Sequence, residues 1–118
     1  MPSSVRNLSV VEYSKDYVDL SWQCPATDGV SPVVQYIVEK CDVTSVVGAV
    51  FSVCGTVAGS ELSIRVGELV EGNSYLFRVS AKNRVGRGPP AMLTEPVVAR
   101  LPIGMPYYFC YINTSFKA

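Results

Sequence analysis

Apolar and polar residues alternate along several short stretches of the chain. Val18, Leu20, Trp22 and Cys24 fall on one side of an extended segment, and the residues between them are mostly polar. A period of two residues is typical of a β-strand with one buried and one solvated face. The pattern therefore predicts a strand over residues 17–24, with Trp22 and Cys24 facing inward.

The same alternation recurs in three further segments, which predicts strands over residues 34–39, 61–66 and 75–82. The residues expected to face inward are Val34, Tyr36 and Val38 in the first, Leu62, Ile64 and Val66 in the second, and Tyr75, Phe77, Val79 and Ala81 in the third. No segment shows the 3.6-residue period of an amphipathic helix.

Turn-forming residues separate the predicted strands. Residues 25–32 contain two prolines and the pair Asp28-Gly29, and glycines and prolines also follow the strand at 75–82. Such residues interrupt a central strand because Pro lacks a backbone N–H and Gly adopts unusual backbone angles. Three further strands around residues 6–11, within 49–57 and around 96–100 bring the count to seven. Seven short antiparallel strands predict an all-β, immunoglobulin-like sandwich of two sheets.

Composition agrees with a single globular β domain. The chain has 118 residues, of which 48% are hydrophobic and 17% charged, and twenty are valine. That length suits one domain of ordinary size, and β-branched residues favour strands. We expect the domain to span residues 2–100. Residues 101–118, with the aromatic run Tyr107–Ile112, do not follow the alternating pattern and are expected to form a poorly ordered linker or chain end.

Charge and residue types exclude several classes of function. Lys and Arg together number 10, as do Asp and Glu, so the chain lacks the basic excess of simple nucleic-acid or membrane binders. It has no histidine, so this chain by itself cannot form a Ser–His or Cys–His catalytic pair or a metal site with histidine ligands. A phosphate-binding loop of the G-x-G-x-x-G type is also excluded, because the stretch Gly86-Arg87-Gly88-Pro89-Pro90-Ala91 has alanine in place of the third glycine. We therefore predict a domain that is not an enzyme and holds no cofactor or metal.

Four cysteines raise the question of disulfides. They are Cys24, Cys41, Cys54 and Cys110, and no pair has the C-x-x-C spacing of a metal site. Strand phase places Cys24 inward and Cys41 on the opposite face of its own strand. This favours free thiols and an intracellular setting over a disulfide between them. The first residues also lack the apolar core of a signal peptide.

An uncharged run from Val43 to Ser60 has about the minimum length of a transmembrane helix. It contains five Ser or Thr residues and three glycines, and it lies between two predicted strands of one domain. We expect a charge-free strand here, which favours aggregation if it lies at a sheet edge. A membrane-spanning helix is the alternative.

Particular motifs then narrow the choice of sandwich. An immunoglobulin domain carries cysteines on its second and sixth strands, where this chain has Trp22 and Phe77. Over residues 2–100 the sequence instead resembles the fibronectin type III family. The motifs that carry the resemblance are Val18-Asp19-Leu20-Ser21-Trp22, Tyr36-Ile37-Val38-Glu39 and Leu69-x-Glu71-Gly72-x-x-Tyr75-x-Phe77-Arg78-Val79-x-Ala81-x-Asn83-x-x-Gly86. The core expected from these motifs comprises Trp22, Tyr36, Leu69, Tyr75 and Phe77, with the Tyr75 hydroxyl bonded to backbone at the corner near Leu69.

A finer resemblance concerns the run from Asp28 to Lys40. It is similar to type III modules of giant muscle proteins of the titin and twitchin group, although Val30 replaces a glycine and Phe51 stands where that group usually has tryptophan. The resemblance implies a structural and protein-binding module of the cytoplasm and sarcomere, which contributes to scaffolding and mechanical resistance. Its partners would be proteins and neighbouring immunoglobulin-like or fibronectin type III domains, and the isolated domain would be a monomer.

Two alternatives to the muscle interpretation stay open. One is an extracellular adhesion or receptor module, which would use the glycosylation sequons at Asn7 and Asn113. The other is a targeting appendage on an intracellular enzyme such as a giant kinase.

The charges are unevenly distributed along the chain. Residues 1–71 hold 4 basic and 9 acidic residues, a net of −5, and residues 72–118 hold 6 and 1, a net of +5. The basic residues gather at Arg78, Lys82, Arg84 and Arg87, and Glu39 is expected to lie across from them on a neighbouring strand. This group is either an ordinary surface ion-pair cluster or a binding patch for an acidic partner.

Overall fold

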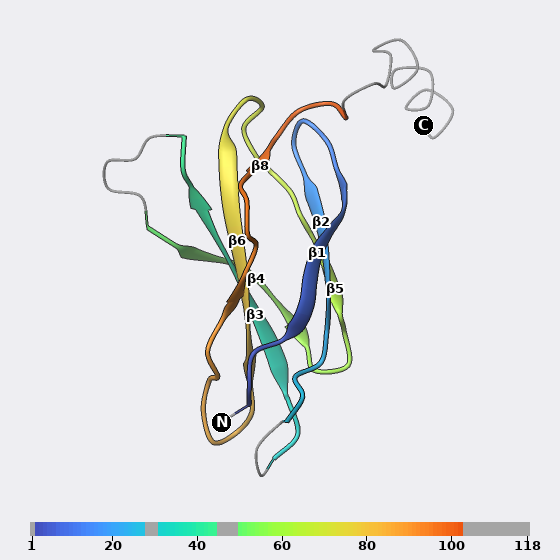
Figure 1. Cartoon of the computed structure of the whole chain (residues 1–118), viewed down its shortest axis with the longest axis vertical. Coiled ribbons are helices and arrows are strands. Elements are labelled where there is room, and N and C mark those ends of the chain that lie inside the picture. Colours follow the sequence, from blue (N-terminus) through green and yellow to red (C-terminus); the bar gives the residue numbers. More distant parts are fainter. Residues whose placement is uncertain (1, 28–30, 45–49, 103–118) are drawn as a thin grey trace.

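The chain forms eight β-strands in two layers (Figure 1), as seen in a computed structural model that describes residues 2–27, 31–44 and 50–102. The strands are β1 (Arg6–Tyr13), β2 (Val18–Gln23), β3 (Gln35–Asp42), β4 (Ser52–Ala58), β5 (Ser63–Val66), β6 (Ser74–Lys82), β7 (Ala91–Met92) and β8 (Val97–Val98). Three expected features lie outside the described residues: the turn at Asp28-Gly29, the aromatic run 107–112, and Cys110 with the sequon at Asn113.

Two antiparallel sheets make up the sandwich. One has the order β1-β2-β5 and the other the order β4-β3-β6-β7, with β8 also paired to β6. The expected all-β antiparallel sandwich is thus confirmed. The last strand predicted around residues 96–100 corresponds to β8, which pairs with Ser74 and Tyr75 of β6. The short strand β7, which pairs with Arg78 and Val79, was not predicted. Pro96, which has no backbone N–H, lies just before β8.

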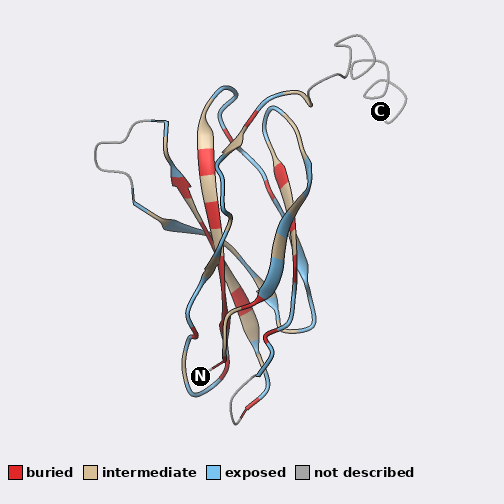
Figure 2. Ribbon diagram, viewed as in Figure 1, coloured by how far each residue is buried: buried red, intermediate tan, exposed pale blue. Residues whose placement is uncertain are grey.

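The core fills the space between the facing sheets. Buried segments are concentrated on β2, β3 and β6 (Figure 2). The fully or almost fully buried side chains of this core include Val18, Leu20, Trp22, Tyr36, Val38, Leu69, Tyr75, Phe77, Val79 and Ala81. Trp22 of one sheet meets Tyr36 of the other edge to face, with ring centroids 5.4 Å apart. Burial also raises the pKa of the Tyr36 hydroxyl above its usual value.

Three positions expected to face inward are exposed, so these predictions are wrong. Cys24 follows the last residue of β2, and the chain turns there into Pro25. Val34 and Leu62 directly precede β3 and β5, and their side chains are 53% and 40% exposed. In each case the alternation continues in the sequence by one residue more than the strand does.

Cys41 lies on the outer face of β3, as its phase predicts, and is nevertheless buried. A register shift between Val38 and Glu39 opposite β4 marks a β-bulge in the pairing of these strands. The three described cysteines, Cys24, Cys41 and Cys54, are free thiols. Burial raises the pKa of the Cys54 thiol.

Part of the uncharged run from Val43 to Ser60 forms β4, which is an edge strand of its sheet. This agrees with the expected charge-free strand; residues 45–49 of the run lie outside the description. Within the described ranges, no helix is long and apolar enough to cross a membrane.

The start of the described chain is fixed against two loops. Ser3 donates its backbone N–H to the Thr27 carbonyl at 2.9 Å, and its hydroxyl accepts the Thr27 N–H at 3.2 Å. Pro2 is fully buried, and a Cβ on Gly88 would lie 2.1 Å from the Pro2 carbonyl oxygen. Only glycine therefore allows the segment at 88 to pack this closely on the first residues.

The corner before β6 is closed by a tyrosine hydroxyl. Tyr75 is buried, and its hydroxyl accepts the backbone N–H of Val70 at 3.0 Å. The expected bond between this hydroxyl and backbone is therefore present. It satisfies an amide in a segment that turns between the two sheets.

The substitution Tyr75→Phe tests this corner. We expect it to lower the free energy of unfolding by about 1–2 kcal/mol, because the Val70 amide loses its acceptor in a partly buried place. Urea denaturation measures the change. The matched control is Tyr17→Phe, whose hydroxyl bonds the exposed Glu12 carboxylate; its expected effect is within about 0.5 kcal/mol. Equal effects of the two substitutions would contradict the role of the corner.

Candidate functional site

A cluster of charged side chains covers the outer face of β3 and β6. Glu39 and Arg78 are direct cross-strand partners. Arg78 donates two hydrogen bonds to the Glu39 carboxylate, at 2.9 Å from Nε and 3.2 Å from Nη2. The expected cross-strand pair between Glu39 and the basic group is therefore confirmed.

Arg87 completes the pairing of Glu39 from a different segment. It follows the turn after β6 and forms a bridge with Lys82, yet its guanidinium also donates to Glu39. Arg87 thus reaches the Glu39 carboxylate from the segment after β6, whereas Arg78 reaches it from the facing position on β6 itself. Ser80, two residues after Arg78 on the same outer face, is fully buried.

An aromatic ring supports the other side of the cluster. The Arg78 guanidinium lies over the Phe51 ring, 4.1 Å from its centroid. An arginine in this position gains cation–π attraction and keeps its planar fork oriented toward the carboxylate. Phe51 takes part although it precedes β4, and the strand pattern gave no sign of this contact. The only indication in the sequence was that Phe51 stands at the position where modules of the titin and twitchin group usually have tryptophan.

The carboxylate of Glu39 is the electrostatic centre of this group. Its side chain is only 8% exposed, compared with 31% for Arg78 and 38% for Arg87. The hydrogen bonds from Arg78, followed by the charge of Arg87, hold the pKa of Glu39 below its usual value against the opposing effect of burial. We call Glu39, Arg78, Arg87 and Phe51 the Glu39 cluster.

The other two residues of the predicted basic patch differ from Arg78 and Arg87. Lys82 and Arg84 are exposed, and neither makes an ion pair with any residue that the structure describes. The patch therefore divides into two arginines that share the Glu39 carboxylate and two exposed cations that have no ion pair among the described residues.

A buried asparagine holds the turn that presents Arg84. The Asn83 side chain accepts the N–H groups of Val85 and Gly86 at 2.9 and 3.0 Å, and it donates to the Ser31 carbonyl at 3.3 Å. The Asn83 backbone N–H also bonds the Gly86 carbonyl. Arg84 and Val85, which is 58% exposed, thus project from a turn of fixed shape.

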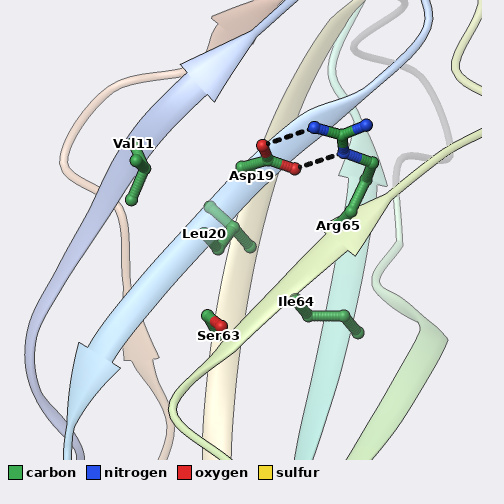
Figure 3. A pocket seen from close by; sticks show the side chains of 6 residues that line it. All are labelled: Val11, Asp19, Leu20, Ser63, Ile64 and Arg65. Carbon is green, nitrogen blue, oxygen red and sulfur yellow. Dashed lines mark hydrogen bonds and ion pairs between the residues drawn. The ribbon is translucent and has the colours of Figure 1, made fainter.

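A second polar group lies on the outer face of the other sheet (Figure 3). Arg65 of β5 grips Asp19 of β2 with two hydrogen bonds of 2.7 and 3.0 Å and lies over the Tyr17 ring, 4.0 Å from its centroid. Asp19 and Arg65 border an open hollow of about 410 Å³, with Val11 on its far side. The two charged residues of this hollow, Asp19 and Arg65, pair with each other. Within the described ranges, no three His, Cys, Asp or Glu side chains gather as metal ligands.

Comparison with known proteins places the chain in a family. The family model of the fibronectin type III domain matches residues 3–97. The chain belongs to the fibronectin type III family. Its fibronectin type III domain is 32% identical over 104 residues to the M-protein of striated muscle from Gallus gallus, covering 88% of this chain and 7% of that protein.

Solved structures of muscle proteins share this fold. A crystal structure of domains from titin matches with a TM-score of 0.75 and 35% identity, over 85% of this chain and 32% of that one. The twitchin kinase region from C. elegans matches with a TM-score of 0.78 and 28% identity, over 90% of this chain and 18% of that one. The resemblance to giant muscle proteins of the titin and twitchin group is therefore confirmed. The chain spans a small fraction of these relatives.

The acid stability of the domain tests the Glu39 cluster. The pKa of Glu39 is lower in the folded state than in the unfolded chain, so its stabilising contribution is complete above the unfolded value of about 4.3 and is lost as pH falls through the folded value. We expect Glu39→Gln to cost about 1–3 kcal/mol near neutral pH, because Arg78 and Arg87 lose a buried acceptor. The difference between the two proteins should shrink below about pH 4.

Denaturant unfolding at several pH values measures this difference. Asp19→Asn is the matched control, because its partner Arg65 is 59% exposed; exposed pairs contribute about 0–1 kcal/mol. A Glu39→Gln effect that is no larger than the control, or that is the same at pH 3 and pH 7, would contradict this account.

Proposed function

We propose that this domain is a non-catalytic structural and protein-binding module of a giant intracellular muscle protein. It acts in the cytoplasm, at the sarcomere, where it contributes to scaffolding and to mechanical resistance. The relatives support the proposal, since the domain covers only 7% of M-protein and 32% of a titin structure that contains several domains. Such proportions are those of one module among many in a series.

One observation carries the proposal of a serial module. The chain begins at one end of the sandwich and leaves the described fold at the opposite end (Figure 1). Domains joined through such termini form a linear array, and a force along the array acts across each sandwich from end to end. The N-terminal β1 and the C-terminal β8 belong to different sheets, so this load passes through the packing between the sheets.

The chemistry of the chain supports a role in binding rather than catalysis. The sequence has no histidine, and the buried carboxylate, Glu39, is neutralised by two arginines. The domain needs no cofactor in this role and binds neither nucleic acid nor membrane. Its partners are neighbouring immunoglobulin-like or fibronectin type III domains and other proteins, and alone it is a monomer.

The basic patch of Arg78, Lys82, Arg84 and Arg87 is the part of the surface proposed for an acidic protein partner. Within it, Arg78 and Arg87 are held in place by their hydrogen bonds to Glu39. Lys82 and Arg84 supply the charge that a partner meets, since both are exposed.

The size and location of the native polypeptide test the proposed function. An antibody raised against this domain should detect a band of giant mass in the myofibrillar fraction of the source tissue. The control is antibody absorbed with the purified domain, which should lose the band. A small, membrane-bound band whose mass falls on deglycosylation would overturn the proposal in favour of an extracellular adhesion module.

A further inference from the structure

The charges that are separated along the sequence are also separated in space. The turn between β1 and β2 and the segment between β5 and β6 lie at the end where the chain leaves the fold (Figure 1). These segments, with the end of β3 and the last described residues, carry four exposed acidic residues and two basic ones. The acidic residues are Asp16, Asp42, Glu68 and Glu71, and the basic ones are Lys15 and Arg100. We call this end the acidic pole.

The opposite end has the reverse charge. The segment between β6 and β7 lies beside the start of the chain (Figure 1). The exposed charged residues around it, among those described, are Arg6, Lys82, Arg84 and Arg87 against Glu61. Asp28 lies outside the described residues. We call this end the basic pole; its Arg84 is exposed on the Asn83 turn and has no ion pair among the described residues.

Both poles are fixed relative to the points where the chain enters and leaves. At the basic pole, Pro2 packs on Gly88 and Ser3 is bonded to Thr27. At the acidic pole, Ala99 is buried and exchanges backbone hydrogen bonds of 2.7 and 3.0 Å with Gly72 and Asn73. The chain thus enters beside Arg87 and leaves beside Glu71, so each pole faces whatever is joined next along the chain.

We propose that the basic pole docks on the acidic end of the module that precedes it in the array, through Arg84 and Lys82. This inference rests on the proposed serial arrangement and names the acidic partner of the basic patch as a neighbouring domain end like the acidic pole of this chain. Val85, beside Arg84, adds an apolar contact at the centre of the docked surface.

The physical effect of this contact is orientation rather than strong affinity. Exposed charge pairs contribute about 0–1 kcal/mol each and are screened beyond about 8 Å at physiological salt. A free domain therefore remains a monomer. Two domains joined by a short linker meet at an effective concentration of about millimolar, at which weak complementary poles can hold a preferred angle.

A tandem of two complete copies of the chain, joined end to end, tests the inference. In this tandem the acidic pole of the first copy faces the basic pole of the second. We expect the rotational correlation time of one labelled copy, measured by NMR relaxation, to fall as NaCl rises from about 20 to about 500 mM, because screening releases the docked poles. Arg84→Glu in the second copy should abolish this salt dependence.

The same substitution in the first copy is the matched control, since that basic pole faces no neighbour. It has the same composition and net charge as the test variant and should keep the salt dependence. Glu71→Arg in the first copy, combined with Arg84→Glu in the second, should restore the coupling. Equal behaviour of test and control, or an unmodified tandem whose tumbling does not respond to salt, would overturn the inference.

The outcome is independent of the experiment on the native polypeptide. A giant myofibrillar band, together with a tandem whose two copies tumble independently, would support the proposed serial module and exclude docking between the basic and acidic poles. A coupled tandem from a polypeptide that is not myofibrillar would keep the docking surface and exclude the muscle role.

Discussion

The packing between two sheets that share no strand, in the described part of the chain, is the constraint on which the rest of the structure depends. Backbone hydrogen bonds hold each sheet together, whereas side chains packed between the sheets hold one sheet against the other. Trp22 and Tyr36 meet across this boundary, and Phe77, Leu20 and Val79 fill the space around them. Burying one such side chain contributes about 1.5–3 kcal/mol, so the inner faces must be occupied almost entirely by apolar residues.

This constraint leaves the outer faces and the two ends for polar chemistry. Glu39 is unusual among the charged residues of these outer faces, because its carboxylate is buried although it lies outside the core. A lone buried charge would be strongly destabilising, and the structure compensates with two arginines and a supporting ring. The same arrangement ties the segment after β6 to the face of the sheet. The turn that carries Arg84 is therefore anchored on one side by Asn83 and on the other by Arg87.

Much of the fold follows from local sequence patterns, and the exceptions have physical causes. The alternation in 75–82 predicts a strand whose inner residues are all buried, because a central strand with both neighbours paired follows its period closely. The alternation fails at Cys24, Val34 and Leu62, where a strand ends while the apolar pattern continues. The strand β7 was missed because its two residues are too few to show an alternation and directly follow the turn-forming residues Gly88 to Pro90.

The candidate site was predictable only in part. Opposite charges on neighbouring strands indicated the pair of Glu39 and Arg78, since cross-strand register follows from the family-like topology. The contact between Arg87 and Glu39 depends on how a loop folds back across the sheet, and no periodicity describes that path. The separation of charge between the two ends likewise required the three-dimensional positions of the turns, although the sequence already showed its two halves with opposite net charge.

The proposed mechanical role requires the sandwich to carry load from end to end as one unit. Single-molecule force spectroscopy on a series of identical copies tests it most directly. We predict discrete unfolding steps, one for each copy, each releasing about 300 Å of chain as the domain opens. Smooth extension at low force, without a step for each copy, would contradict the claim.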